Sequence, residues 1–172
     1  HWIQLARDIA GRWTHADPKA RVAWAGPSMS VRSSITARHM ETWAHGQEVF
    51  DLFGEARADT DRIRNIVVLG VNTFGWSHLV HGAPAPPAMP QLVLTAPSGA
   101  RWEYGDAAAG RIEGPAVGFA QAVTQTRNWR DTGLTATGEV AIWWMEHAQC
   151  FAGTPQLPPA PGARVRAAHR PD

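Results

Sequence analysis

The stretch HGAPAPPAMPQ, residues 81–91, divides the chain into two parts of different character. It holds four prolines, at positions 84, 86, 87 and 90, and proline is disfavoured both inside a helix and in a central strand. We therefore expect a proline-rich linker over residues 84–91. A helical part is expected before it, over residues 1–83, and a small α+β part after it, over residues 92–153. The predicted fold class is α+β.

The part before the linker is predicted to be helical, because its apolar residues recur every three or four positions. The predicted helices cover residues 2–15, 31–53 and about 60–82. Ser30 is of a residue type that favours a helix N-cap, and Gly54 suits the C-terminal end of the second helix. We expect these helices to pack as a bundle with Trp2, Trp13 and Trp43 inside.

The part after the linker alternates short strands with helices. The predicted strands cover residues 91–95, 101–104, 111–113 and 134–137, and the predicted helices cover residues 116–126 and 139–151. The turn Pro97–Ala100 should join the first two strands into a hairpin. The expected core residues are Leu92, Leu94, Phe119 and Ile142. The tail, residues 154–172, is expected to be mobile.

Composition excludes several classes of protein. Sixteen basic and fifteen acidic residues give a net charge of +1 without a concentrated basic stretch, so nucleic acid is not an expected partner. No run of about 18 apolar residues predicts a membrane span. A single cysteine, Cys150, forms no internal disulfide, and no signal peptide is present; both features favour the cytoplasm. The chain opens at His1 inside a helical pattern, and we interpret it as the later part of a longer protein.

Glu41 and His45 carry the strongest chemical signal. They lie four residues apart on a predicted helix, which places both side chains on one face. A carboxylate and an imidazole are both zinc ligands, but a catalytic zinc site takes at least three protein ligands, so the pair is an incomplete site. The alternative is a surface pair worth a few tenths of a kcal/mol. His78 and His81 are weaker metal-ligand candidates, since the last turn of a helix also favours histidine through the helix dipole.

Two arginines form a second candidate site. Arg127 and Arg130 flank Trp129 in a predicted loop. Guanidinium groups bind carboxylates in a bidentate manner, so the pair is a candidate for substrate binding in catalysis. The alternative is an exposed polar loop in which Asp131 is the ion-pair partner. Cys150 is expected to be a small buried residue rather than a nucleophile.

Several runs of sequence resemble a known family. They begin with Gly26–Ser30 and Thr36–Arg38 and centre on Met40–Gln47, which reads Met-Glu-Thr-Trp-Ala-His-Gly-Gln. Shorter matches follow at residues 69–71, 94–97, 114–116, 123–125, 137–138 and 148–155. Together they resemble a largely actinobacterial group of metal-binding proteins in the DinB-like superfamily, similar to mycothiol-dependent maleylpyruvate isomerases.

This resemblance implies a fold and a metal site. The fold is an N-terminal DinB-like four-helix bundle followed by a small C-terminal α+β domain. The metal is a divalent ion, usually zinc, held by a histidine on an early helix and by a Glu-x-x-x-His pair that Glu41 and His45 match. The early histidine has no counterpart in this sequence and is expected before residue 1. The resemblance also implies a low-molecular-weight thiol such as mycothiol.

The leading functional hypothesis is a metal-dependent thiol transferase or thiol-assisted isomerase that acts on a small organic molecule. Only a thiolate attacks, and a bound divalent cation lowers the pKa of a thiol. The alternatives are a non-catalytic metal- or ligand-binding protein and a biosynthetic enzyme that uses the bundle pocket without metal. A bundle that lacks an early helix should expose an apolar groove, which we expect to be filled either by the missing segment of the same protein or by a second copy of the chain in a homo-oligomer.

Overall fold

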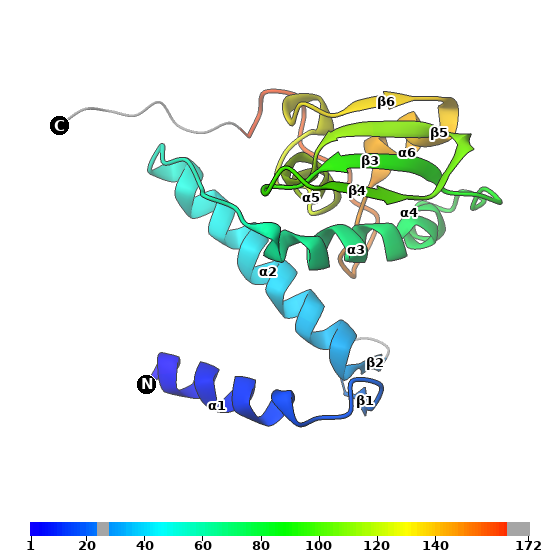
Figure 1. Ribbon diagram of the computed structural model, residues 1–172. Coiled ribbons are helices and arrows are strands. Elements are labelled where there is room, and N and C mark those ends of the chain that lie inside the picture. Colours follow the sequence, from blue (N-terminus) through cyan, green and yellow to red (C-terminus); the bar gives the residue numbers. More distant parts are fainter. Residues whose placement is uncertain (24–27, 165–172) are drawn as a thin grey trace.

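The computed structural model describes residues 1–23 and 28–164 and combines helices with two small sheets (Figure 1). In chain order its elements are α1 (Trp2–Thr14), β1 (Arg21–Val22), β2 (Met29–Ser30), α2 (Val31–Leu52), α3 (Arg64–Asn72), α4 (Phe74–Val80), β3 (Pro90–Thr95), β4 (Arg101–Tyr104), β5 (Asp106–Pro115), α5 (Ala116–Val123), β6 (Thr135–Thr137) and α6 (Glu139–His147). Short 3-10 turns cover Asp61–Ile63 and Trp129–Asp131. The expected α+β composition, with a helical N-terminal part, is confirmed.

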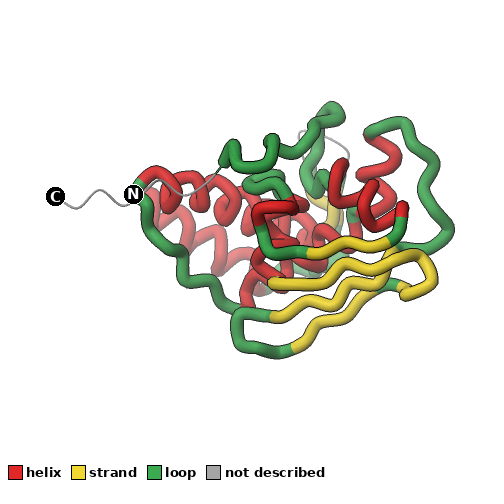
Figure 2. The backbone as a smooth tube through the Cα atoms, turned by 90° about the horizontal axis from the view of Figure 1, so that it is seen from above, coloured by secondary structure: helices red, strands yellow, loops and turns green. Residues whose placement is uncertain are grey.

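The larger sheet has the strand order β4-β3-β5-β6. Strand β3 pairs antiparallel with β4, as the predicted hairpin requires, and parallel with β5. Strand β5 pairs antiparallel with β6. Burial alternates along β3, and the helices lie on one face of the sheet (Figure 2). Gly105, with φ +80°, joins β4 to β5 where a side chain would clash with the carbonyl of Pro90.

One hydrophobic cluster extends through both parts of the chain. Leu92, Leu94 and Phe119 have no exposed surface, and Trp43 and Ile66 belong to the same cluster. Residues from before and after the linker therefore pack together in one core, because α3 lies against α5. Whether residues 1–83 and 92–153 behave as independent domains stays a prediction.

The prediction that Ile142 lies in the core is wrong. Its side chain is 38% exposed, whereas Ala141, Trp144 and Met145 of the same helix are buried. Helix α6 is apolar around most of its circumference, so its sequence pattern did not specify which side faces the sheet. The fold selects the face that carries Trp144.

Helix α2 begins as predicted. The Ser30 hydroxyl accepts a hydrogen bond from the Ser33 N–H at 3.1 Å, which satisfies one free donor of the first turn. The third predicted helix is instead two helices, which meet at Thr73. The Thr73 hydroxyl donates to the carbonyls of Leu69 and Gly70. The apolar period continues through this break, so the sequence pattern did not reveal it.

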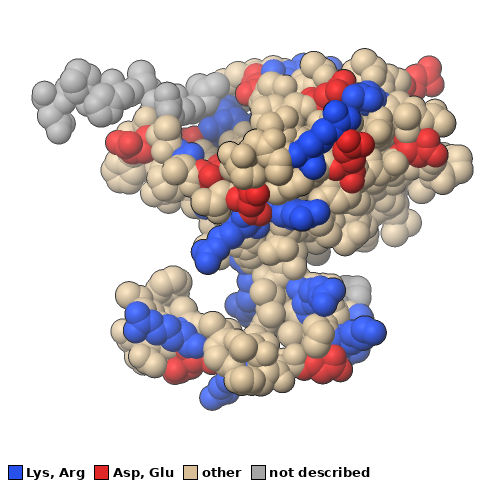
Figure 3. Space-filling model, in the orientation of Figure 1, with Lys and Arg blue, Asp and Glu red and all other residues tan. Residues whose placement is uncertain are grey.

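Helix α1 stands apart from the rest of the protein (Figures 1 and 3). It has no buried residue, and Trp2 is 76% exposed. The expectation that Trp2 packs inside a bundle is therefore wrong, and Trp13 is only half-buried. The bundle itself is not confirmed. Amphipathic spacing specifies which face of a helix is apolar but not what covers it.

Residues on both sides of the β-sheet part, in the linker and in the tail, have specific contacts in the structure. Strand β3 already begins at Pro90, at the first strand position, where proline is tolerated. In the tail, the Gln156 N–H donates to the Gln149 side chain at 2.9 Å, and the Asn128 side chain donates to the Pro159 carbonyl at 2.8 Å. Buried amide side chains thus contact residues 154–164, and the mobility of the tail stays a prediction.

Three further observations complete the fold. Residues 165–172 of the predicted tail lie outside the described part of the chain, as do residues 24–27 in the connector between α1 and α2, including Gly26 and Pro27 of the run Gly26–Ser30. The flanks of that connector form a small antiparallel pair, β1 with β2. Within residues 1–23 and 28–164, no helix is both long and apolar enough to cross a membrane.

Candidate functional site at helix α2

The run Met40–Gln47 separates two faces of α2. Met40, Trp43, Ala44 and Gln47 recur at helical spacing and are buried. The Trp43 indole donates to Asp59 at 2.8 Å. These contacts fix the rotation of α2, so that the neighbouring face, which carries Glu41 and His45, points away from the core.

Arg57 packs across the same part of α2. Its guanidinium donates to the Trp43 carbonyl at 2.6 Å and lies 5.1 Å from the centre of the Trp43 ring. It passes close to Gly46, where a Cβ atom would lie 3.4 Å from the guanidinium. Glycine in this run therefore leaves room for Arg57, which is a structural reason for the residue type.

Glu41 and His45 lie together, as their spacing predicts. Glu41 Oε2 and His45 Nε2 are 3.5 Å apart, and the two side chains are 48% and 74% exposed. Two ligands of a tetrahedral zinc ion, each about 2.1 Å from the metal, are about 3.4 Å apart. The separation therefore fits two neighbouring ligands of one ion, with little rearrangement.

Glu48 lies on the other side of the imidazole. Its Oε2 atom is 3.8 Å from His45 Nδ1, beyond hydrogen-bond distance, on the side of the ring from which a carboxylate can orient a metal-ligating histidine after a small shift. Across residues 1–23 and 28–164, no group of three His, Cys, Asp or Glu side chains could hold a metal ion. The pair thus fits part of a metal site, and further ligands are needed.

The pair borders a groove of about 370 Å³. One wall is α2, with Glu41, His45 and Glu48. The other wall comes from residues far along the chain: Thr124, Gln125, Thr126, Phe151, Ala152, Gln156, Leu157, Pro159 and Arg164. Sequence reasoning missed this wall, because only the tertiary structure brings the tail to α2.

Gln125 and Arg164 hold the far wall in place. Gln125 has φ +56°, and its amide donates to the carbonyls of Ala148 and Gln156 at 3.0 and 2.9 Å. Arg164 lies 3.4 Å from the Glu48 carboxylate. The shape and polarity of the groove therefore depend on the segment expected to be a free tail. The sequence did not predict the positive φ angle of Gln125, which is the one local feature that marks this wall of the groove among the described residues.

Cys150 is buried, as predicted, and lies near the same groove. Burial raises the pKa of the Cys150 thiol strongly, and the negative charge of Glu41 raises it further. The thiol therefore stays protonated at neutral pH and is not a nucleophile. A thiolate in this groove would have to come from a ligand.

Arg127 and Arg130 have partners within the protein. Arg127 is buried and pairs with Asp51 of α2, and it also donates to the Thr126 carbonyl. Arg130 pairs with Glu146 of α6 at 2.8 Å and packs 4.5 Å from the Trp129 ring centre. Each arginine thus links its own segment to a helix, Arg127 to α2 and Arg130 to α6. A catalytic role for them stays a prediction. The expected partner Asp131 instead accepts from the Gly162 N–H.

The remaining histidines lie elsewhere. His39 is half-buried on another side of α2, and burial, together with the charges of Arg62 and Arg57, lowers its pKa. His78 and His81 lie at the end of α4, beside α6 and away from the Glu41–His45 pair.

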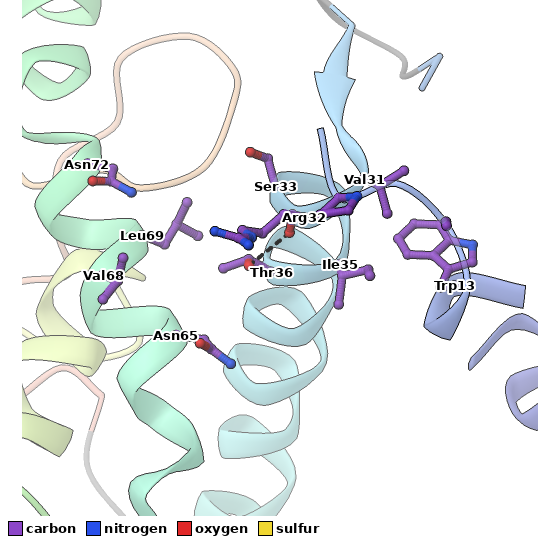
Figure 4. A pocket seen from close by; sticks show the side chains of 12 residues that line it. Trp13, Val31, Arg32, Ser33, Ile35, Thr36, Asn65, Val68, Leu69 and Asn72 are labelled. Carbon is purple, nitrogen blue, oxygen red and sulfur yellow. Dashed lines mark hydrogen bonds between the residues drawn. The ribbon is translucent and has the colours of Figure 1, made fainter. Parts of the chain in front are cut away.

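A second cavity, of about 520 Å³, lies between the C-terminal end of α1, the start of α2 and the outer face of α3 (Figure 4). Arg32, Thr36, Asn65 and Asn72 line it together with apolar side chains. None of the predicted site residues lines this cavity, although it lies partly in the same N-terminal segment as Glu41 and His45.

Comparison with known proteins bears on the N-terminal part. Residues 1–50, which include Glu41 and His45, match the family model described as mycothiol maleylpyruvate isomerase N-terminal domain. Over these residues the chain is similar to that family. The resemblance found in the sequence is thereby confirmed.

Two mycobacterial relatives extend the similarity. Uncharacterized proteins from Mycobacterium tuberculosis strains CDC 1551 / Oshkosh and ATCC 25618 / H37Rv are each 46% identical over 137 residues, or 78% of this chain. The chain spans about half the length of these relatives, 53%. No solved structure matches the chain significantly.

Proposed function

We propose that the protein is a metal-dependent thiol transferase or thiol-assisted isomerase that acts on a small organic molecule. The observation that carries the proposal is the Glu41–His45 pair at a polar groove, with donor atoms 3.5 Å apart. The pair lies inside the segment that matches the mycothiol maleylpyruvate isomerase N-terminal domain. A low-molecular-weight thiol such as mycothiol is the proposed cosubstrate.

Glu41 and His45 would hold a divalent cation, for which zinc is the proposed ion. The bound ion would supply positive charge that favours the thiolate form of a ligand thiol. One carboxylate and neutral imidazoles leave a zinc site with net positive charge. A third protein ligand is needed, and the resemblance assigns it to a histidine on an early helix.

The protein's own residues have separate roles in this proposal. Glu48 orients the His45 ring through Nδ1 and leaves Nε2 toward Glu41. Gln125 shapes the opposite wall, and Arg164 supplies the nearest guanidinium for an anionic ligand. Cys150 stays a protonated, buried thiol, so that it does not compete with the ligand thiol.

Metal content and thiol binding test this function. Purified intact protein, with the early histidine that the resemblance implies, is expected to hold about one zinc per chain by elemental analysis, and His45→Ala and Glu41→Gln should lose most of it. His15→Ala is the matched control, because His15 is exposed at the end of α1, away from the groove. Mycothiol should bind the zinc-loaded protein in calorimetry and support isomerisation of maleylpyruvate.

Two results would reject parts of the proposal. Unchanged zinc content in His45→Ala would remove the pair from the metal site. Zinc binding at the pair without any thiol binding would leave a non-catalytic metal-binding protein.

A further inference from the structure

Three histidines surround one tryptophan where α4 and α6 meet. The rings of His78 and His147 both stack on the Trp143 ring, with distances between ring centres of 4.1 Å for His78 and 4.2 Å for His147. The His81 ring stands edge-on to His147 at 5.2 Å. This cluster involves neither α2 nor the groove beside it.

All three histidines make the same hydrogen bond. The Nδ1 atoms of His78, His81 and His147 lie 3.0, 2.9 and 2.8 Å from the backbone carbonyl four residues earlier. A carbonyl only accepts, so each Nδ1 carries the hydrogen, and in the neutral ring Nε2 keeps its lone pair. This tautomer is the one in which Nε2 can bind a metal ion.

The Nε2 atom of His81 is buried and has no hydrogen-bond partner among the described residues. A buried acceptor without a partner is unfavourable, because it has lost its hydrogen bond to water and gained none within the protein. The neighbouring histidine, His147, presents a second Nε2 with the same tautomer. The two rings are neighbours, with their centres 5.2 Å apart, and packing among the described residues does not explain the unpartnered Nε2 atom of His81.

We propose that His81 and His147 form a two-histidine site that binds a divalent transition-metal ion through their Nε2 atoms. Imidazole suits copper, nickel and zinc, and affinity among these ions is highest for copper. The backbone carbonyls fix both ring orientations, which is the usual support of a ligating histidine. Water completes the coordination. The site is separate from the Glu41–His45 pair.

Titration with Ni²⁺ alone tests the site in tag-free protein that carries His1→Ala, which removes the terminal imidazole. His147→Phe keeps an aromatic ring on Trp143 but removes both nitrogens, and His81→Phe does the same at the other ligand. Each variant is expected to bind Ni²⁺ at least tenfold more weakly at one site. His45→Ala should keep that site. Unchanged Ni²⁺ affinity in both phenylalanine variants, or its loss in His45→Ala alone, would overturn the proposal.

Two spectroscopic measurements make the test independent of variant stability. Ni²⁺ should quench part of the tryptophan fluorescence, and Trp143→Phe should remove that part while Ni²⁺ still binds. In unaltered protein, Zn²⁺ should shift the Nε2 resonances of His81 and His147 in nitrogen-15 spectra. Resonances of these two rings that do not move at saturating Zn²⁺ would also overturn the proposal.

Discussion

Helices α1 and α5 are both amphipathic, yet only one of them is packed. Every residue of α1 is at least partly exposed, including Trp2, Ile3 and Ile9. In α5, Phe119 and Val123 have at most 1% of their surface exposed. Apolar surface stabilises a fold only when it is removed from water, at about 25 cal/mol per Å². The two helices thus show that similar patterns contribute very differently to stability.

The largest expected difference in stability is between a substitution in α5 and one in α1. Phe119→Ala removes a fully buried ring and should lower the free energy of unfolding by about 4 kcal/mol, including the cavity term. Ile9→Ala changes an exposed side chain of α1 and should stay within about 0.5 kcal/mol. Urea denaturation followed by circular dichroism measures both. A similar loss in the two variants would mean that α1 is covered in solution.

A second contrast concerns the two arginines. Arg127→Met breaks a buried pair with Asp51, whose side chains are 10% and 15% exposed, and should cost about 3 kcal/mol. Arg130→Met breaks a pair with Glu146 that is 47% and 40% exposed, and should cost less than about 1 kcal/mol. Thermal unfolding of both variants tests this order. Equal stability, with weakened binding of an anionic substrate in Arg127→Met, would favour the site role predicted from sequence.

Gly70 in the packed helix α3 and Gly11 in the exposed helix α1 should respond oppositely to the same substitution. At Gly70 in α3, an added Cβ would lie 2.9 Å from both Phe119 and Val123, so Gly70→Ala should destabilise by about 2 kcal/mol through overpacking. At Gly11 in α1, an added Cβ meets nothing within 4 Å, so Gly11→Ala should stabilise the helix by up to about 1 kcal/mol. Denaturant midpoints of the two variants should move in opposite directions. A loss in Gly11→Ala would reveal a contact on the free face of α1.

The smallest expected effect is a change in the pH dependence of stability, caused by His39 on α2. Burial first, and then the charges of Arg62 and Arg57, lower the pKa of His39 from its ordinary value of 6.5. The unfolded chain therefore binds more protons at His39 than the folded protein does, and stability should fall as pH drops below about 6.5. His39→Gln should reduce this dependence in unfolding at pH 7.5 and pH 5. A steeper dependence in the variant would contradict the sign.

Local features of the fold could be predicted from the sequence because their causes are local. Ser30 caps α2 through its own hydroxyl, and the turn before Arg101 closes the β3–β4 hairpin. The Glu41–His45 pair follows from helical spacing, as does the burial of Trp43 on the adjacent face. These predictions needed only the period of the elements and the chemistry of single residues.

Other features had causes that the local pattern does not contain. The inward face of α6, the break at Thr73 and the partners of Arg127 and Arg130 depend on which elements meet. The contacts of residues 154–164 are also non-local, because buried Gln149 and Asn128 use the backbone of this segment as hydrogen-bond partners.

The sequence by itself determined the α+β composition, the extent of α2 and the pairing of Glu41 with His45, since spacing along a helix sets which side chains are neighbours. Only the tertiary structure decided that residues 124–126 and 151–164 face that pair across a groove. It also placed His81 beside His147 and left α1 uncovered. Contacts between distant segments depend on packing and closure of the whole chain, which no window of local sequence encodes.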